Sequence, residues 1–290
     1  MRYYQLREEG DPRLAVEAAG SVYDLTAAKS RLQTFDDLLS AADIANRSVD
    51  ALVDQLIEEA NVRQIESVND RAIESPLSSG EVWAAGVTYQ ISEKARKAES
   101  SMPDMYLEVY ESDRPEVFFK ATPNRTVGPD ETVGIRADSD WDVPEPELGV
   151  VLSQDEIVGY TIGNDMSSRS IEGENPLYLP QAKVYDRCCS IGPCIISADA
   201  IDDPHELEMW MRISRDGEIR YDESTNTSKM VRSVEELTEY YVKHNAVSDV
   251  SVLLTGTSLV PGEEFTLQEG DVVEIGIEEI GTLTNTVVEV

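Results

Sequence analysis

Two carboxylates lie two residues apart at the start of an apolar run, in the segment WDVPEPELGVV. They belong to Glu145 and Glu147. On an extended chain, residues i and i+2 point to the same side, so these two side chains project together. Neighbouring carboxylates repel each other unless a cation lies between them. The pair therefore suggests a cation site, and the simpler alternative is two solvated acids in an acidic protein.

A third carboxylate, Asp165, ends the apolar run GYTIGND, which begins just after the first run turns. If the two runs pair as a hairpin, all three carboxylates can meet at one edge. Three carboxylates with waters form a hard-oxygen site suited to Mg²⁺, or to Mn²⁺ in its place. The two histidines, His205 and His244, lie in helical or turn-like surroundings. A zinc site built on imidazole is therefore not expected.

Two lysines lie beside apolar residues in a chain that has only seven lysines. They are Lys120 in VFFKAT and Lys183 in PQAKVYD. The simpler explanation is a lysine whose stem packs on apolar groups while its ammonium stays in water. The alternative is a lysine held near the metal and the substrate, where it could take part in acid–base chemistry.

The elements that must position these groups are mostly strands. Residues 1–27 alternate between short strands and turns, and helical patterns then follow the N-cap residues Thr34 and Ser48. We predict a small α+β domain over residues 1–78. Residues 79–290 form the larger domain, in which short apolar or alternating runs are separated by turns and helices are expected only at 91–100 and 234–244. This pattern favours an α+β, β-rich fold whose larger domain is a barrel or roll.

The charge balance excludes two classes of partner. Asp and Glu total 57 against 24 Lys and Arg, a formal net charge of −33, so nucleic acid and anionic membranes would repel the chain. The acids are spread along the sequence rather than collected in a tail, which would be typical of a partner-binding acidic protein. Dispersed acids with scarce lysine indicate a halophilic protein. At about 1 M salt the Debye length is roughly 3 Å, so self-repulsion is screened.

The sequence predicts a cytoplasmic protein. It begins MRYYQLREEG, which is not a secretory signal, and it has no apolar run near the ~20 residues that span a bilayer. The three cysteines, Cys188, Cys189 and Cys194, are an odd number in one short stretch. They fit neither a disulfide framework nor a paired zinc motif, so we expect small buried thiols.

Several motifs in order resemble the fumarylacetoacetate hydrolase superfamily over residues 81–290. They are E-x-E-L-x-x-V, G-Y-T-x-x-N-D-x-S-x-R, K-x-x-D before G-P, T-G-T, and a closing G-D-x-V-x-x-x-I-x-x-I-G-x-L-x-N. The resemblance implies a β-roll and a divalent metal held by Glu145, Glu147 and Asp165. It also implies that Lys183 faces the substrate, that Thr257 offers it a hydroxyl, and that the chain forms a dimer or tetramer.

Departures from the motifs narrow the expected reaction. The C–C bond hydrolases carry a G-x-N-Y-x-x-H segment whose histidine activates water, but residues 85–93 read AGVTYQISE and contain no histidine. With the runs WAAGVTY, RPEVFFK and WDVPEPEL, the chain is similar to the 2-keto-3-deoxy-sugar-acid dehydratase branch. That branch converts 2-keto-3-deoxy-D-arabinonate into 2-oxoglutarate semialdehyde in pentose degradation.

This resemblance leads to a set of expected roles. Mg²⁺ would polarise the 2-oxo group of the substrate. Lys183 or a nearby carboxylate would remove a proton from C3, and Glu116, with Glu111 behind it, would protonate the leaving C4 hydroxyl. We expect the substrate to be held by four residues: Val87, Thr88, Lys120 and Thr257. The charged segment 91–112 could close over the site as a lid.

Two other functions remain open at this point. One is a C–C bond hydrolase or decarboxylase of an acylpyruvate-like 2-oxo acid on the same fold, because a fold alone does not decide the reaction. The other is a non-catalytic acidic binding protein. The intact set of three carboxylates and Lys183 argues against the second, which the absence of a tight Mg²⁺ or Mn²⁺ site would favour.

Overall fold

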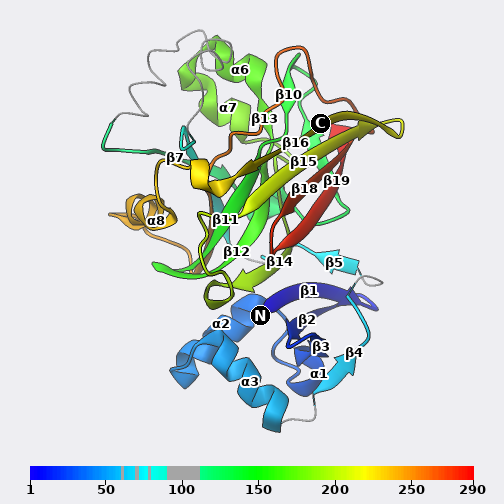
Figure 1. Cartoon of the computed structure of the whole chain (residues 1–290), viewed down its shortest axis with the longest axis vertical. Helices are drawn as coiled ribbons and strands as arrows, with labels where there is room; N and C mark the ends of the chain where they lie inside the picture. The colour runs from blue at the N-terminus through cyan, green and yellow to red at the C-terminus, as the bar shows by residue number, and fades with distance from the viewer. Residues whose placement is uncertain (60–61, 69–71, 78–79, 90–111) are drawn as a thin grey trace.

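The computed structural model describes the whole chain except residues 60–61, 69–71, 78–79 and 90–111. Strands predominate, and the N-terminal part forms one end of the molecule (Figure 1). That part contains β1 (Arg2–Glu8), β2 (Asp11–Ala18), β3 (Ser21–Asp24), α1 (Leu25–Ala28), α2 (Phe35–Ala45), α3 (Val49–Glu59), β4 (Arg63–Ile65) and β5 (Ala72–Glu74).

The remainder of the chain contains most of the strands. The strands are β6 (Glu81–Gly86), β7 (Glu116–Ala121), β8 (Thr126–Val127), β9 (Thr132–Ile135), β10 (Asp142–Val143), β11 (Pro146–Ser153), β12 (Glu156–Asp165), β13 (Ser167–Ser168), β14 (Cys189–Ser197), β15 (Glu208–Arg215), β16 (Glu218–Asn226), β17 (Val250–Leu254), β18 (Val272–Ile277) and β19 (Gly281–Glu289). The helices are α6 (Arg169–Glu174), α7 (Leu179–Lys183) and α8 (Val234–Val242), with short 3₁₀ turns at Pro123–Arg125, Pro176–Tyr178, Ala198–Ala200 and Thr227–Lys229.

One large sheet runs through both parts of the chain. Its described strands follow the order β4-β3-β2-β1-β14-β12-β11-β17-β6-β7, with β5 on β1 and β8 on β14. The N-terminal strands join it where Arg2 and Tyr3 of β1 pair with β14. A second sheet has the order β16-β15-β18-β19-β9, and β10 pairs with β13. The β-rich fold is therefore confirmed, while the division at residue 78 stays a prediction.

The predicted hairpin of the two apolar runs is present as β11 and β12. The strands are antiparallel, with Glu147 opposite Gly163 and Val150 opposite Tyr160. The turn between them contains Gln154 in the left-handed region, with φ of 55°. Seven of the eight residues of β11 are buried, because β12 and β17 flank the strand and both of its faces are covered. Central strands of this kind read as continuous apolar runs.

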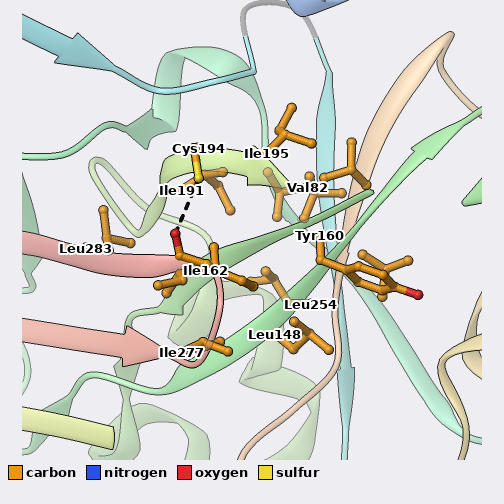
Figure 2. Close-up of a cluster of buried hydrophobic side chains, with 14 of the residues drawn as sticks. Val82, Leu148, Tyr160, Ile162, Ile191, Cys194, Ile195, Leu254, Ile277 and Leu283 are labelled. Carbon is orange, nitrogen blue, oxygen red and sulfur yellow. Dashed lines mark hydrogen bonds between the residues drawn. The ribbon is translucent and has the colours of Figure 1, made fainter. Parts of the chain in front are cut away.

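An apolar core fills the space beside this hairpin. Figure 2 shows side chains from both sheets converging there, among them Leu148 and Ile162 from the hairpin and Ile277 and Leu283 from the second sheet. The three cysteines are free and buried, as predicted, and Cys194 Sγ lies 3.4 Å from the carbonyl of Ile280. The core thus holds the β11–β12 hairpin in place, and one end of this hairpin carries the carboxylates.

The predicted helix starts after Thr34 and Ser48 are confirmed. Thr34 Oγ1 accepts the Asp37 N–H and Asp37 Oδ2 accepts the Thr34 N–H, a reciprocal capping box. Ser48 Oγ accepts the N–H of Ala51 at the start of α3. The expected helix near 234–244 is α8, capped by Ser233. Among the described helices, none has the length and apolarity needed to cross a bilayer.

The expectation of few helices in the larger part was incomplete. The predicted helix at 91–100 and most of the proposed lid lie outside the described residues. The structure adds α6 and α7, which are six and five residues long and contain Gly173 and Pro180 respectively. Helices this short, with a glycine or proline inside them, give no clear helical periodicity. They matter because α7 ends on Lys183.

Candidate metal centre

The carboxylates of Glu145, Glu147 and Asp165 meet at one end of the β11–β12 hairpin. Glu145 directly precedes β11, Glu147 is its second residue, and Asp165 is the last residue of β12. One oxygen from each carboxylate lies within 4.8 Å of the others. The three residues are 7%, 2% and 1% exposed. The predicted convergence of these side chains is confirmed.

Backbone contacts hold the three carboxylates in place. The N–H of Asp165 donates to the carbonyl of Glu145 at 2.9 Å, which ties the two strand ends together. The Glu145 N–H donates to Asn164 Oδ1 at 3.2 Å. The N–H of Gly256, in the T-G-T loop, donates to Glu147 Oε2 at 2.6 Å. The loop and the hairpin therefore share one buried polar cluster.

Three side-chain cations contact two of the three carboxylates. Lys183 Nζ lies 3.0 Å from both Glu145 Oε2 and Asp165 Oδ2, and it donates to Ser167 Oγ at 2.6 Å. An Arg169 guanidinium nitrogen lies 3.0 Å from Glu145 Oε1. Lys120 Nζ lies 2.6 Å from Asp165 Oδ1. Glu145 and Asp165 are therefore paired by side-chain cations, whereas the contact described for Glu147 is with a backbone N–H.

This asymmetry sets the proton affinities of the carboxylates. Burial raises the pKa of Glu147 well above its usual value, and the charges of Asp165 and Glu145 raise it further. Burial also acts on Glu145, but the charges of Lys183 and Arg169 outweigh it and lower the pKa of Glu145 to about 2. Burial disfavours charged Lys183, yet the Asp165 and Glu145 carboxylates raise its pKa, so Lys183 is an ammonium group.

The donor set fits a hard divalent cation. The described ligand atoms are carboxylate oxygens, the type that Mg²⁺ and Mn²⁺ prefer. The described contact of Glu147 is a backbone N–H rather than a side-chain cation, and a divalent cation would supply the missing positive charge. Glu145, Glu147 and Asp165 are thus the residues that would hold the metal.

Strand β7 presents Glu116, Phe118 and Lys120 at alternate positions, and these residues border the cluster. Lys183 Nζ lies 5.6 Å from the centre of the Phe118 ring, a cation–π contact. Glu116 pairs in register with Gly86 of β6. Burial, followed by the charge of Glu172, raises the pKa of Glu116 to about 7. Glu116 can therefore hold or release a proton near neutral pH.

Lys120 is completely buried, and its contacts differ from those expected of a substrate-binding lysine. Besides Asp165, its ammonium donates to the carbonyl of Met166 at 2.8 Å and to the carbonyl of Lys183. Burial alone would lower the pKa of Lys120, but the charge of Asp165 raises it. The ammonium thus has two backbone acceptors and one carboxylate partner within the protein, and the predicted contact of Lys120 with substrate stays a prediction.

The other predicted substrate residues lie around the T-G-T loop. Val87 adopts the left-handed conformation, with φ of 56°. Thr88 is buried, and its hydroxyl donates to the carbonyl of Thr255 at 2.5 Å, so it braces the loop. Thr257 is half-buried, and its Oγ1 accepts the Leu259 N–H at 3.0 Å, which leaves its O–H free to donate. Glu111 lies outside the described residues.

The sequence interpretation did not identify Phe118, Ser167 and Arg169 as site residues. The sequence nevertheless contained a pattern that pointed to each of these three residues. Ser167 and Arg169 follow Asp165 at two and four residues within a quoted motif. Phe118 lies between Glu116 and Lys120 in a strand-like run, so a period of two already placed the three residues on one face.

Comparisons with known proteins agree with this arrangement. Residues 81–288 match the family described as Fumarylacetoacetate (FAA) hydrolase C-terminal. The chain belongs to the fumarylacetoacetate hydrolase family. This matched range includes the metal centre, strand β7 and the T-G-T loop. The suspected resemblance is confirmed.

Members of the fumarylacetoacetate hydrolase family with high similarity carry related names. A "Probable 2-keto-3-deoxyxylonate dehydratase" of Haloferax volcanii is 61% identical over 290 residues, which is all of both chains. A "2-dehydro-3-deoxy-D-arabinonate dehydratase" of Saccharolobus solfataricus is 45% identical over 76% of each chain. A solved structure, "2-keto-3-deoxy-D-arabinonate dehydratase complexed with magnesium and 2,5-dioxopentanoate", has a TM-score of 0.83 at 34% identity. It covers 100% of this chain and 99% of its own.

Proposed function

We propose that the chain is a Mg²⁺-dependent hydro-lyase that converts a 2-keto-3-deoxypentonate into 2,5-dioxopentanoate, also called 2-oxoglutarate semialdehyde. The observation that carries this proposal is the full-length similarity to a dehydratase whose solved structure holds magnesium and 2,5-dioxopentanoate. The buried site of Glu145, Glu147 and Asp165 supplies the oxygen ligands that such a metal needs. The two dehydratase relatives, at 61% and 45% identity, support the same substrate class.

The metal would act as a Lewis acid that polarises the 2-oxo group and makes the C3 protons more acidic. The chain's own part is to bind, orient and move protons. Lys183, an ammonium beside Asp165, is proposed to donate a hydrogen bond to an oxygen of the substrate, in exchange for one of its three contacts with Glu145, Asp165 and Ser167. Its raised pKa argues against Lys183 as the base at C3, one of the two options in the sequence analysis. A carboxylate remains the candidate for that base.

Glu116 is the proposed proton-transfer group. Its pKa of about 7 lets it give a proton to the C4 hydroxyl, which leaves as water while C3 loses a proton. A proton then moves from C5 to C3, and the resulting enol becomes the C5 aldehyde. The net change is the loss of one water. Thr257, with a free O–H, and the backbone at Val87 and Thr88 are proposed to hold the substrate's hydroxyls and carboxylate.

The C–C bond hydrolase remains the alternative. Among the described residues, the histidines are His205 and His244. His205 Nε2 accepts the N–H of Val234 at the start of α8, at 3.1 Å, so it has a structural contact there. These positions lie outside the glycine–tyrosine segment in which the hydrolases carry their histidine. A hydrolase would therefore need a different base.

We further propose that the protein works in a high-salt cytoplasm as a homo-oligomer, either a dimer or a tetramer. The net charge of −33 and the scarcity of lysine support the high-salt environment. The oligomer rests on the family resemblance. Sedimentation velocity at high salt would measure the assembly state directly, and a monomer would contradict the proposal.

The assay that tests the function uses purified protein in high salt with Mg²⁺ and 2-keto-3-deoxypentonate. The aldehyde product is followed with a semialdehyde dehydrogenase and NAD(P)⁺. We expect turnover that disappears with EDTA and in Glu147→Gln. Cleavage of an acylpyruvate without turnover of the sugar acid would favour the hydrolase. Absence of tight Mn²⁺ binding would favour the non-catalytic protein.

A further inference from the structure

Lys120 lies at the junction of three elements of the site. Its side chain leaves β7 and is 0% exposed. Its ammonium lies 2.6 Å from Asp165 Oδ1, at the end of β12, and donates to the carbonyl of Met166 at 2.8 Å. It also donates to the carbonyl of Lys183, the last residue of α7. One buried cation thus contacts a metal-ligand candidate and the backbone of the substrate-facing lysine.

The ammonium combines two hydrogen bonds with one ion pair. It donates to the carbonyls of Met166 and Lys183, and it lies in ion-pair contact with Asp165 Oδ1. A buried charge is tolerated only when it is paired and hydrogen-bonded, which is the case here. The carbonyl of Lys183 belongs to the last turn of α7, where helical carbonyls lack partners within the helix. Lys120 therefore caps that helix as well as neutralising Asp165.

The same geometry relates the two ends of Lys183. The backbone carbonyl of this residue is held by Lys120, while its side-chain nitrogen lies 3.0 Å from Asp165 Oδ2. Asp165 in turn uses its other oxygen, Oδ1, for Lys120. Lys120, Asp165 and Lys183 therefore form a closed loop of three contacts.

We propose that Lys120 is a positioning residue, which fixes the ammonium of Lys183 relative to the carboxylate of Asp165 and does not itself contact substrate. This inference deepens the proposed function, on which its kinetic test rests. A shift of about 1 Å between reacting groups can lower a rate by about 10²-fold. Short α7, with only five residues, has few other contacts within the helix to keep Lys183 in place.

The first test is geometric and needs no activity. In crystals of metal-free Lys120→Met, we expect Lys183 Nζ to lose at least one of its 3.0 Å contacts with Asp165 and Glu145. Lys243→Met is the matched control. It removes the same charge from a side chain that is 54% exposed, and should leave both contacts unchanged. Unchanged contacts in Lys120→Met would overturn the proposal.

The second test is kinetic, with Mn²⁺ as the probe of the metal site. We expect Lys120→Met to lower kcat by about 10²-fold while KM changes little. Mn²⁺ should still bind, since Asp165 keeps its carboxylate and loses a competing cation. A purely structural role would lower thermal stability without this separation of kcat from Mn²⁺ binding. Normal kcat, or loss of Mn²⁺ binding in a folded variant, would contradict the proposal.

A second variant covers the case in which Lys120→Met does not fold. Lys120→Gln retains two N–H donors for the two carbonyls but brings no charge to Asp165. We expect a folded protein with kcat lowered about tenfold, and wild-type kcat in this variant would overturn the proposal. Failure of the wild type to turn over 2-keto-3-deoxypentonate would instead reject the proposed function. The crystallographic test of Lys120→Met would be unaffected by that result.

Discussion

The carboxylate of Glu116 occupies the space into which a side chain at Gly86 would point. The two residues are paired across β7 and β6, and a Cβ added to Gly86 would lie 2.0 Å from Glu116 Oε2. Atoms cannot approach so closely, so any larger residue at this position must displace the carboxylate. Gly86 does not have a positive φ, so its backbone conformation does not require glycine. Glycine is needed at this position because a side chain would collide with the carboxylate of Glu116.

Gly86→Ala should therefore impair catalysis more than folding. We expect kcat to fall by about 10²-fold because Glu116 is moved, with the Mn²⁺ affinity retained. Steady-state kinetics and a Mn²⁺ titration measure the two quantities. The control is Gly173→Ala, whose added Cβ would meet nothing within 4 Å, and which should keep its kcat. An equal loss in both variants would show that Glu116 is not the affected group.

The pH dependence of the rate should reveal the role of Glu116. Its pKa is raised to about 7, so the group is protonated below that pH and charged above it. If Glu116 donates a proton to the leaving hydroxyl, kcat should fall as pH rises through about 7. In Glu116→Gln, kcat should be lower by about 10²–10⁴-fold and should no longer fall as the pH rises through about 7. A rate that instead falls below pH 7 would identify Glu116 as a base.

The metal-ligand candidates should differ in their effect on stability when no metal is present. Burial, with the charges of Asp165 and Glu145, holds the pKa of Glu147 well above its usual value, so this side chain binds a proton more readily than an ordinary glutamate. Glu147→Gln should change the free energy of unfolding by less than about 1 kcal/mol. Asp165→Asn removes the partner of two buried lysines and should cost about 3–5 kcal/mol. Urea unfolding in EDTA compares them, and equal losses would contradict this charge assignment.

Salt should stabilise the protein strongly. With a net charge of −33, self-repulsion destabilises the folded state at low ionic strength, and salt screens it. We expect the Tm to rise steadily between about 0.2 M and about 3 M KCl, because the Debye length falls to roughly 3 Å at 1 M. Differential scanning calorimetry measures this change. A Tm that is independent of salt would contradict the proposed high-salt environment.

The sequence was sufficient to predict the hairpin and its carboxylates for a physical reason. Two apolar runs are joined by a short turn, and the acids lie at the start of the first run and at the end of the second. Pairing the runs as a hairpin buries them and gathers the acids at one end. Glu145, Glu147 and Asp165 lie as that arrangement requires. The helix starts at Thr34 and Ser48 were also predictable, because N-cap chemistry is local in sequence.

The role of Lys120 could not be predicted in the same way. A lysine beside apolar residues can reach toward water, substrate or protein, and the choice depends on acceptors that are distant in sequence. The carbonyl of Lys183 lies 63 residues further along the chain. The sequence analysis left open whether Lys120 reaches water or lies near the metal site, and its contacts became evident only from the three-dimensional arrangement. The sequence analysis also did not predict α7. This helix has only five residues and no helical periodicity, so contacts with distant parts of the chain hold it.

The pairing of β1 with β14 has a consequence for any attempt to study the catalytic part by itself. Deleting the N-terminal region would remove β1 from the sheet and leave β14 unpaired on the side of Ile195 and Ile196 that β1 covers, while its pairing with β12 would remain. An apolar edge of this kind is a template for pairing with other molecules. Such a fragment should therefore aggregate even if its metal site is intact, so a limited-proteolysis product that stays soluble should retain β1.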